Sequence, residues 1–542
     1  MLSYRKLAMR VLGRPFHTGR IDSPRPASQR AAAFILTAAM LTTLAAPAFA
    51  DIWHIENGDI TISAGESGNN VTQNNNTTYG DTNTIITNQN KDTASSHTVT
   101  IEAKDKDDKV EVTLKDVNID TSSRNKAAVS VTGEGDTNIK LDGDNALKSD
   151  IYRSGIYGSG SGSLTISGGE NDSLTAQGGS GANGISSSGS LTISGGTVTA
   201  NGDDGGRGIS SSGSVTISGG STVTANGGSG TISGGDGICS SGGVTISGGS
   251  TVTANGGNGG SLVGGDGIRS GGGLTVSDGT VTAKGGNGDS KDGYGGDGIR
   301  SGGVVTISGN TVNAAGGYGG KVGGYGICSF DRVAISGGTV EAAGGNGSTG
   351  GGSGIYSSVI DLSGSLELTA KAGSPTGKAL LQNGRELDLD TIKDKLGPGA
   401  KVTATDANGE TKQVSIPRPV EPEEPVIPEE SSSSSDGGSA TPSAPVSPLP
   451  GLTVTDRDGQ RISYTSTQSG NTLTVCVGRL TASFRISLAA LRQLRAEGIE
   501  TITFQTILCS TTLSVDELLA MGGEDAEAVL THRFTDSSLT VG

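Results

Sequence analysis

One phrase recurs down the middle of this chain: Gly-Ile-x-Ser, followed by Leu/Val-Thr-Ile-Ser-Gly-Gly-Thr-Val-Thr-Ala. Subtracting the positions of successive isoleucines gives intervals of 29, 24, 29, 30, 31, 28 and 28 residues. The isoleucines are Ile156, Ile185, Ile209, Ile238, Ile268, Ile299, Ile327 and Ile355. Self-similarity at this period indicates an array of stacked units, because one such unit cannot bury its apolar face alone.

A single repeat shows what the unit is. Apolar and polar residues alternate over 268–270, 274–277 and 280–283, as in strands with one buried face. We assign the breaks, Gly271–Gly273 and Asp278-Gly279, to turns that need positive φ and no Cβ. Stacking such units at about 4.8 Å pairs each strand with the next unit above and below. The repeat therefore predicts a parallel β-helix.

Equivalent positions of successive repeats carry β-branched or leucine side chains, which form the predicted core. One position holds Leu164, Leu191, Val215, Val244, Leu274, Val305 and Val333; another holds Ile166, Ile193, Ile217, Ile246, Val276, Ile307 and Ile335; a third holds Val198, Val223, Val252, Val281, Val312 and Val340. Without a period, 93 glycines would indicate disorder. With one, they favour an ordered solenoid.

Composition divides the chain into six segments. The fold class we predict is mainly β, a parallel β-helix followed by a small α+β domain. The segments are a signal peptide (1–50), an N-terminal cap with the first coils (51–154), the glycine-rich repeats (155–372), a C-terminal cap (373–416), a Pro/Ser/Glu-rich linker (417–450) and the α+β domain (451–542). Trp53 is interpreted as a plug of the N-terminal cap. In the last domain we expect a helix from Leu488 to Glu497 and a capping box at Ser514-x-x-Glu517.

The first 50 residues predict export. Seven basic residues precede an apolar stretch from Ala31 to Ala46, which closes on Ala48-Phe49-Ala50. Alternatives are an uncleaved anchor, a true start at Met9, or a long leader of the autotransporter kind. We expect cleavage after Ala50, a secreted or surface-associated protein, and no membrane insertion afterwards. Cleavage leaves 32 basic (39 − 7) and 54 acidic (55 − 1) residues, a net charge of −22, which disfavours nucleic acid as a partner.

Four cysteines divide between the two regions. Cys239 and Cys328 occupy the same repeat position three units apart, about 14 Å at the strand spacing, too far for a disulfide. We interpret them as free thiols. Cys476 and Cys509 lie on predicted strands of the last domain and are a candidate disulfide in an exported protein; two buried thiols are the alternative.

Charged residues recur beside the isoleucines. Asp236, Asp266 and Asp297 each precede a Gly-Ile pair, and Arg269 and Arg300 follow two of those isoleucines. Stacked carboxylates repel each other unless something neutralises them. An Asp/Arg ladder is one explanation, and a calcium ion bridging the aspartates is the other. The repeats contain no histidine for a catalytic triad, because all four histidines lie outside them: His17, His54, His97 and His532.

The run Gly-Gly-Asp-Gly-Ile-Arg-Ser-Gly-Gly with Leu-Thr-Val-Ser-Asp-Gly-Thr-Val-Thr-Ala resembles the repeats of a bacterial carbohydrate-binding β-helix family, related in fold to polysaccharide lyases. The resemblance covers about residues 51–372 and specifies the fold better than the ligand. It implies an extracellular, adhesin-like protein that binds plant or microbial polysaccharide without catalysis, with calcium as a candidate cofactor.

Aromatic residues make up only 3% of the chain, yet sugar rings commonly stack on aromatic side chains. We therefore predict the carbohydrate site where aromatics and charges of both signs gather: Arg269, Arg300, Tyr294, Tyr318 and Tyr325, beside the aspartates as candidate metal ligands. The Asn residues at the position of Tyr318 are interpreted as a ladder that stabilises turns. Alternative functions are a structural surface stalk that displays the C-terminal domain and a calcium-dependent polysaccharide lyase. The oligomeric state is left open.

Overall fold

The computed structural model describes residues 51–309, 311–417, 451–456, 460–462, 464–469, 471–479, 481–506, 510–521, 526–533 and 536–541. The chain divides into two compact units, Met1–Pro422 and Glu423–Gly542. The predicted signal peptide and nearly all of the predicted linker lie outside the described residues. No helix in the described ranges is long and apolar enough to cross a membrane.

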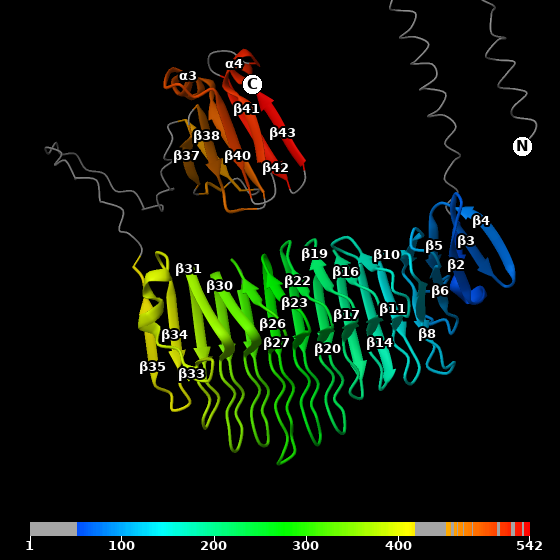
Figure 1. Ribbon diagram of the computed structural model, residues 1–542. Coiled ribbons are helices and arrows are strands. Elements are labelled where there is room, and N and C mark those ends of the chain that lie inside the picture. Colours follow the sequence, from blue (N-terminus) through cyan, green and yellow to red (C-terminus); the bar gives the residue numbers. More distant parts are fainter. Residues whose placement is uncertain are drawn as a thin grey trace, which may run out of the picture. The chain divides into compact units, whose positions relative to one another are not determined.

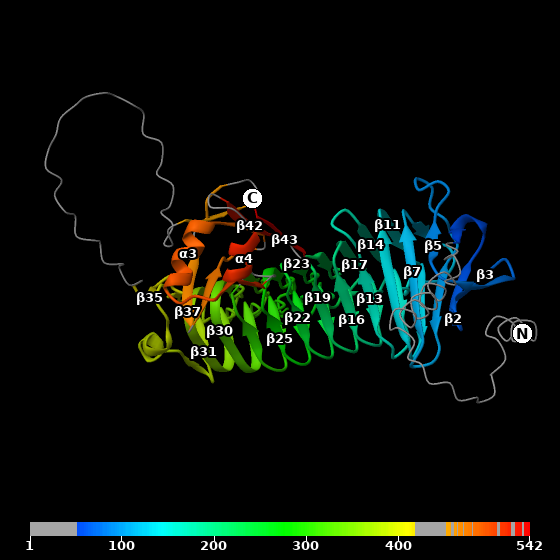
Figure 2. The same cartoon turned by 90° about the horizontal axis from the view of Figure 1, so that it is seen from above.

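The first unit is a parallel β-solenoid of about 14 turns (Figures 1 and 2). Each turn, or rung, of the glycine-rich region contributes three short strands. The first strands are β12 (Ile156–Gly158), β15 (Ile185–Ser187), β18 (Ile209–Ser211), β21 (Ile238–Ser240), β24 (Ile268–Ser270) and β27 (Ile299–Ser301). The second strands are β13 (Leu164–Ser167), β16 (Leu191–Ser194), β19 (Val215–Ser218), β22 (Val244–Ile246), β25 (Leu274–Val276) and β28 (Val305–Ile307). The third strands are β14 (Ser173–Ser180), β17 (Thr197–Asp203), β20 (Thr222–Asn226), β23 (Ser250–Asn255), β26 (Gly279–Lys284) and β29 (Thr311–Ala315).

The register matches the predicted columns. Ile156 pairs with Ile185, and the pairing continues in parallel through every anchor isoleucine to Ile355. The last two rungs are formed by the long strands β30 (Ile327–Ala343) and β31 (Ile355–Lys371), each of which bends through all three strand positions. The predicted parallel β-helix is confirmed.

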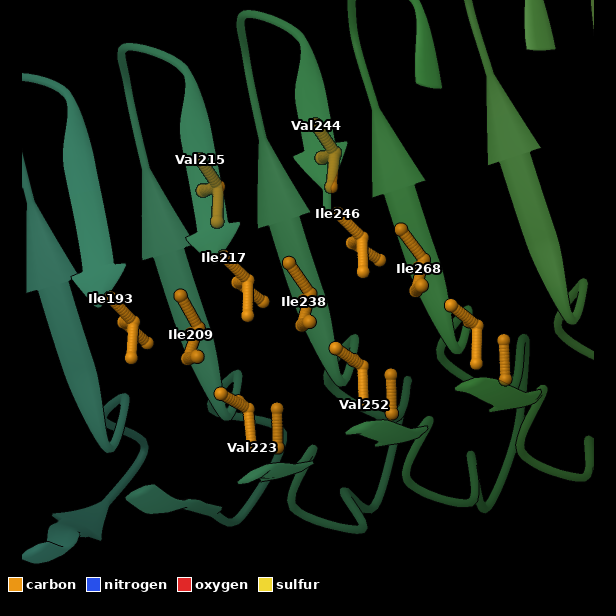
Figure 3. Close-up of a cluster of buried hydrophobic side chains, with 14 of the residues drawn as sticks. Ile193, Ile209, Val215, Ile217, Val223, Ile238, Val244, Ile246, Val252 and Ile268 are labelled. Carbon is orange, nitrogen blue, oxygen red and sulfur yellow. The ribbon is translucent and has the colours of Figure 1, made fainter. Parts of the chain in front are cut away.

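The core is a dry stack of aliphatic side chains. Figure 3 shows Ile209, Ile217 and Val223, one from each strand of a rung, pointing into the same interior. All three are at most 1% exposed, and the same holds for their equivalents in the neighbouring rungs. A β-branched column facing itself fits the pleat and packs without polar groups. Stacking therefore buries the apolar side chains that a single rung would leave exposed to water.

One expectation about glycine is wrong. Gly271–Gly273 was assigned to a turn with positive φ, but none of these residues has one. A Cβ on Gly271 would instead lie 2.3 Å from the carbonyl oxygen of Ser241 in the rung below. Close approach of two backbones excludes a side chain at this corner. Positive φ is required at the next corner, for example at Gly248 (63°) and Gly249 (72°).

The solenoid begins with a cap. Its first coils contain β5 (Thr84–Thr87), β6 (Val99–Ala103), β7 (Lys109–Lys115), β8 (Asn118–Asp120), β9 (Val129–Gly133), β10 (Asp136–Asp142) and β11 (Asp144–Lys148). Before them come β1 (Ile52–His54), the 3-10 turn η1 (Ile55–Asn57), and β2 (Ile60–Gly65), β3 (Gly68–Gln73) and β4 (Asn76–Asp81), the last three joined as antiparallel hairpins. Trp53 packs on the core and donates Nε1–H to Oδ2 of Asp81 at 3.1 Å, which confirms its role in the cap.

The other end is closed by irregular structure. β32 (Leu380–Gln382) and β33 (Arg385–Glu386) precede the 3-10 helix η2 (Leu389–Lys395), and β34 (Lys401–Thr405) pairs antiparallel with β35 (Thr411–Ser415). Leu389, Ile392 and Leu396 cover the last rung of the core. An antiparallel hairpin and a helix leave no parallel edge for further stacking, as a terminal cap must.

The second unit is a small α+β domain with its own core. One sheet contains β36 (Leu452–Thr455), β39 (Ala482–Ser487), β42 (Glu527–Arg533) and β43 (Asp536–Val541); the other contains β37 (Thr465–Ser469), β38 (Thr472–Cys476), β40 (Thr501–Gln505) and β41 (Ser510–Ser514). The helices are α3 (Leu488–Ala496) and α4 (Val515–Met521). Ser487 Oγ caps α3 by accepting from the N–H of Ala490, and Ser514 Oγ accepts from that of Glu517 at 3.4 Å, as the capping box predicts.

Candidate functional site

The site is built on glycine arms that project from one side of the solenoid (Figure 1). After the third strand of each rung the chain runs outward and then returns to the first strand of the next rung. Gly265, on a return arm, donates its N–H to Gly257 O on the outward arm at 2.8 Å, and Gly257 donates to Gly235 O of the rung below at 2.8 Å. A Cβ on Gly256 would lie 1.9 Å from Gly265 O. Only glycine allows this packing, as at the crowded axis of collagen.

These contacts repeat along the array. The hydrogen bonds alternate between the two arms of one rung and the arms of adjacent rungs, without a break. The residues in the chain of bonds are Gly206, Gly228, Gly235, Gly257, Gly265, Gly286, Gly296, Gly317, Gly324, Gly345, Gly352 and Gly373. The arms therefore form an ordered, two-layered glycine slab whose interior positions are occupied by backbone alone.

A period of three places side chains on the outside of the slab. On the return arms, two glycines of every three face backbone, so that every third position can carry a side chain. This face, the return-arm face, carries three columns. The tip column is Ser233, Val263, Tyr294, Val322 and Gly350; the aspartate column is Asp236, Asp266, Asp297, Tyr325 and Ser353; the arginine column, on the first strands, is Cys239, Arg269, Arg300, Cys328 and Tyr356.

The aspartate column is a backbone-capping ladder. Oδ1 of Asp236 accepts from the N–H of Asp266 at 2.9 Å, and Oδ1 of Asp266 accepts from that of Asp297 at 2.8 Å. Oδ1 of Asp297 continues the pattern with the N–H of Tyr325 at 2.7 Å. The three aspartates are 4–6% exposed. Each carboxylate thus satisfies an N–H that would otherwise be buried without a partner.

Two arginines neutralise part of this charge. Arg300 Nη1 lies 3.4 Å from Oδ2 of Asp297, and Arg207 Nε lies 3.1 Å from Oδ2 of Asp236. Asp266, between them, has no ion pair among the described residues. Burial and the charges of Asp297 and Asp236 raise the pKa of Asp266 to about 7. Burial also raises the pKa of Asp297, to about 6, although hydrogen bonding by Tyr325 N–H and the charge of Arg300 favour its ionised form.

Arg207 was not predicted as part of this ladder. It occupies the aspartate column itself, one rung below Asp236, so that its backbone N–H is capped by Asn183 Oδ1 at 2.8 Å. The predicted Asp/Arg ladder, with Arg269 and Arg300 as cations, is therefore right for Arg300 alone, and Arg207 takes the place expected for Arg269. Arg269 is exposed and makes no ion pair within the described part of the chain.

Three aromatic rings lie on the two rungs that follow Arg300. Its guanidinium lies over the ring of Phe330, 5.3 Å from the centroid, and the Phe330 side chain is 54% exposed. Tyr325 and Tyr356 stack beside it, with centroids 5.0 Å apart and an angle of 15° between the rings. Phe330 was missed from the sequence, although it stands where the other rungs carry Ser or Gly. That exception to the repeat was the signal that could have found it.

The predicted tyrosines do not form one cluster. Tyr325 lies in the aspartate column, next to Asp297. Tyr294 lies in the tip column, six residues before Arg300, which is about 19 Å of extended chain at 3.1 Å per residue. Lys321 Nζ lies over its ring at 5.6 Å. Tyr318 belongs to the outward arms, where Asn287 Oδ1 accepts from its N–H at 2.9 Å. One sugar ring could not contact all three tyrosines.

The asparagine ladder is confirmed on the outward arms. Asn258 Oδ1 accepts from the N–H of Asn287 at 2.8 Å, and Asn287 Oδ1 repeats this with Tyr318. A second ladder joins Asn255 Nδ2 to Asn226 Oδ1 at 2.8 Å. Side-chain amides are therefore used to hold successive arms in register.

The described residues contain no group of three or more His, Cys, Asp or Glu side chains placed to hold a metal ion. The Oδ1 atoms of Asp236, Asp266 and Asp297 already accept backbone N–H groups. Ca²⁺ requires six to eight oxygen ligands, and one oxygen of each of these carboxylates is already engaged by backbone. The ladder is the explanation that the geometry favours.

The cysteines of the array are free thiols. Burial raises the pKa of Cys239 to about 11 and that of Cys328 to about 12, so both are uncharged at neutral pH. In the second unit, Cys476 Sγ lies 3.5 Å from Oε1 of Gln505. Cys476 is a free thiol, so the predicted disulfide with Cys509 is wrong at this residue. Cys509 itself lies outside the described residues.

No family model, curated protein or solved structure matches this chain.

Proposed function

We propose that the solenoid is an extracellular, non-catalytic surface that binds polysaccharide at Arg269, Arg300, Phe330 and the Tyr325–Tyr356 stack. The observation that carries this proposal is the Arg300 guanidinium held over the half-exposed ring of Phe330. An exposed ring offers an apolar platform for the C–H face of a sugar, and guanidinium N–H groups are donors for its hydroxyls.

The form of the surface supports a polymer as ligand. The arginine column runs along adjacent strands at about 4.8 Å per rung, so that it is extended and repetitive, whereas small-molecule sites are concave. The predicted export signal supports contact with glycans outside the cell. A binding role also fits the aspartate ladder, in which each carboxylate accepts a hydrogen bond from a backbone N–H. The lyase alternative would instead need a calcium ion beside an arginine that acts as the base.

Affinity electrophoresis of the full chain in gels that contain plant or microbial polysaccharides tests the proposal. Phe330→Ala should weaken retention about tenfold, the effect of losing roughly 1.4 kcal/mol of aromatic contact. Tyr157→Ala is the matched control, because Tyr157 is 43% exposed on the first strand of a distant rung. Equal mobility of the wild-type protein and the Phe330 variant in every retarding gel would refute the proposed site.

A structural stalk is the second candidate, favoured by the separate core of the C-terminal domain. About 14 rungs at about 4.8 Å give a rod of about 67 Å. Leu491→Asp places a charge in the C-terminal core while the solenoid remains unchanged. If the array binds the glycan, this variant keeps its retention. Loss of retention in this variant, with none in Phe330→Ala, would favour the stalk.

A further inference from the structure

We infer that Arg269 and Arg300 form an anion-binding pair that selects acidic polysaccharides, those with carboxylate or sulfate groups. The inference deepens the proposed function and rests on it. The two arginines are direct partners on adjacent parallel strands, β24 and β27. Like charges directly opposite each other are unfavourable, so a pair on the surface of an acidic protein needs a counter-charge.

The local charges supply that counter-charge incompletely. Six charged or titratable side chains of the aspartate and arginine columns face one another here: Asp236, Asp266, Asp297, Arg207, Arg269 and Arg300. The other ionisable groups beside them, Cys239, Cys328 and Tyr325, are uncharged. Arg207 forms an ion pair with Asp236, and Arg300 forms one with Asp297. Arg269 makes no ion pair among the described residues, and its charge acts on Asp297, which Arg300 already pairs. Asp266 is the carboxylate of the column that is left without an ion pair in the described residues.

Asp266 is a poor counter-ion at neutral pH. It is 5% exposed and lies between two other carboxylates, so ionisation costs more here than in water. With a pKa of about 7 it is half protonated at pH 7 and almost fully protonated at pH 5.5. Asp297, with a pKa of about 6, is also mostly protonated at pH 5.5, so the three arginines and three aspartates then carry more than one net positive charge. Asp331 and Arg332, next to Phe330 in sequence, have opposite formal charges.

The acidic character of the whole chain does not prevent this. The formal net charge is −16, but exposed charges are screened beyond about 8 Å at physiological ionic strength. The charges in direct contact with the ligand therefore determine whether an acidic polysaccharide binds. Guanidinium groups bind carboxylates and sulfates through paired, charge-assisted hydrogen bonds, and Phe330 offers ring surface beside Arg300.

The test is retention of the full chain at 0.15 M salt in gels of polygalacturonate, dextran sulfate, and the neutral polysaccharides galactan and dextran. Carboxylates of the ligand stay ionised at pH 5.5 and pH 8, because ordinary carboxyl pKa values lie near 4. We expect the acidic gels to retain the protein at pH 5.5 and about fivefold less at pH 8, the effect of one partly exposed ion pair. Polygalacturonate and dextran sulfate distinguish the two sources of negative charge.

Three variants complete the design. Arg269→Ala should lose about fivefold in retention by acidic gels at pH 5.5. Lys284→Ala, an exposed cation on the third strand of the same rung, is the control and should behave as wild type. Asp266→Asn should lose less retention between pH 5.5 and pH 8 than the wild type does, a result that a merely structural role of Asp266 would not produce; the remaining loss is the ionisation of Asp297. Thermal unfolding of each variant verifies that it is folded.

The outcomes separate the inference from the proposed function. Retention by neutral gels that equals retention by acidic ones, or an Arg269→Ala variant that binds acidic gels as the wild type does, overturns the anion-binding pair and leaves polysaccharide binding standing. No retention by any gel overturns both.

Discussion

The backbone N–H of Asp297 donates to Oδ1 of Asp266 at 2.8 Å, so that each aspartate of the column serves the rung above it. This use of a carboxylate as a local acceptor explains why three acidic residues are tolerated on consecutive rungs at 4–6% exposure. It also gives the column a measurable effect on stability.

Asp266→Asn should remove a pH dependence of folding. The pKa of Asp266 is raised in the folded state, so the native protein binds more protons than the unfolded chain between about pH 4 and pH 7. Wild-type stability therefore falls as pH rises through that window, by on the order of 2–4 kcal/mol for this group. The asparagine keeps an acceptor oxygen and carries no charge. Thermal unfolding from pH 4 to pH 8 should show that the melting temperature of the variant rises relative to that of the wild type as pH increases. Asp289→Asn, at an exposed position, is the control. Parallel curves of melting temperature against pH for Asp266→Asn and the wild type would contradict this prediction.

Asp59→Asn should act in the opposite direction, at the N-terminal cap. Partial burial opposes its ionisation, but Lys126 (3.0 Å) and Arg124 (2.8 Å) hold the pKa of Asp59 at about 2. Its contribution is present above about pH 4 and lost as pH falls towards 2. Because the Asp59 side chain is 35% exposed, screening by solvent reduces the effect to about 1 kcal/mol. Unfolding by urea at pH 7 and at pH 2.5 should show a difference between variant and wild type at the higher pH alone.

Gly265→Ala tests the glycine slab. The new Cβ would lie 1.9 Å from Gly235 O, a backbone atom that cannot move without disturbing the next arm. We expect a loss of at least 1–3 kcal/mol, the usual cost of overpacking. Gly337→Ala is the control, since its nearest neighbour would lie at 3.4 Å and its φ is not positive. Equal melting temperatures for the two variants would show that the arms are not packed as described.

Removal of calcium should leave the protein unchanged. The Oδ1 atoms of the aspartate column are engaged with backbone N–H groups, so we expect the same melting temperature with calcium and with a chelator. Differential scanning fluorimetry measures this directly. A rise with calcium that disappears in Asp266→Asn would restore the metal hypothesis.

The repeat predicted the core well because burial acts on single positions. Ile209 and Ile238 occupy equivalent places in the sequence and pair directly in the sheet. The column of aspartates and its need for a compensating partner were equally visible, but its bonds to backbone N–H groups and the part played by Arg207 were not. In each case, one repeat along the sequence corresponds to one rung of the solenoid.

The glycine arms could not be predicted in this way. Glycine in a sequence indicates either positive φ or close approach, and the residue itself does not distinguish them. Gly257 and Gly265 meet because two arms of one rung run side by side, a fact of three-dimensional packing. The same reason separates Tyr294 from Tyr318: the residues are near in sequence, but one lies on a return arm and the other on an outward arm.

The unbroken hydrogen bonding from Gly206 to Gly373 limits how such a protein can change in length. An arm in the middle of the slab is bonded on both sides, so deletion of part of a rung would leave two neighbours unmatched. Deletion or duplication of a complete repeat of 28–31 residues would bring equivalent glycines into contact again. The array should therefore tolerate changes in repeat number between related genes far better than small insertions within its arms.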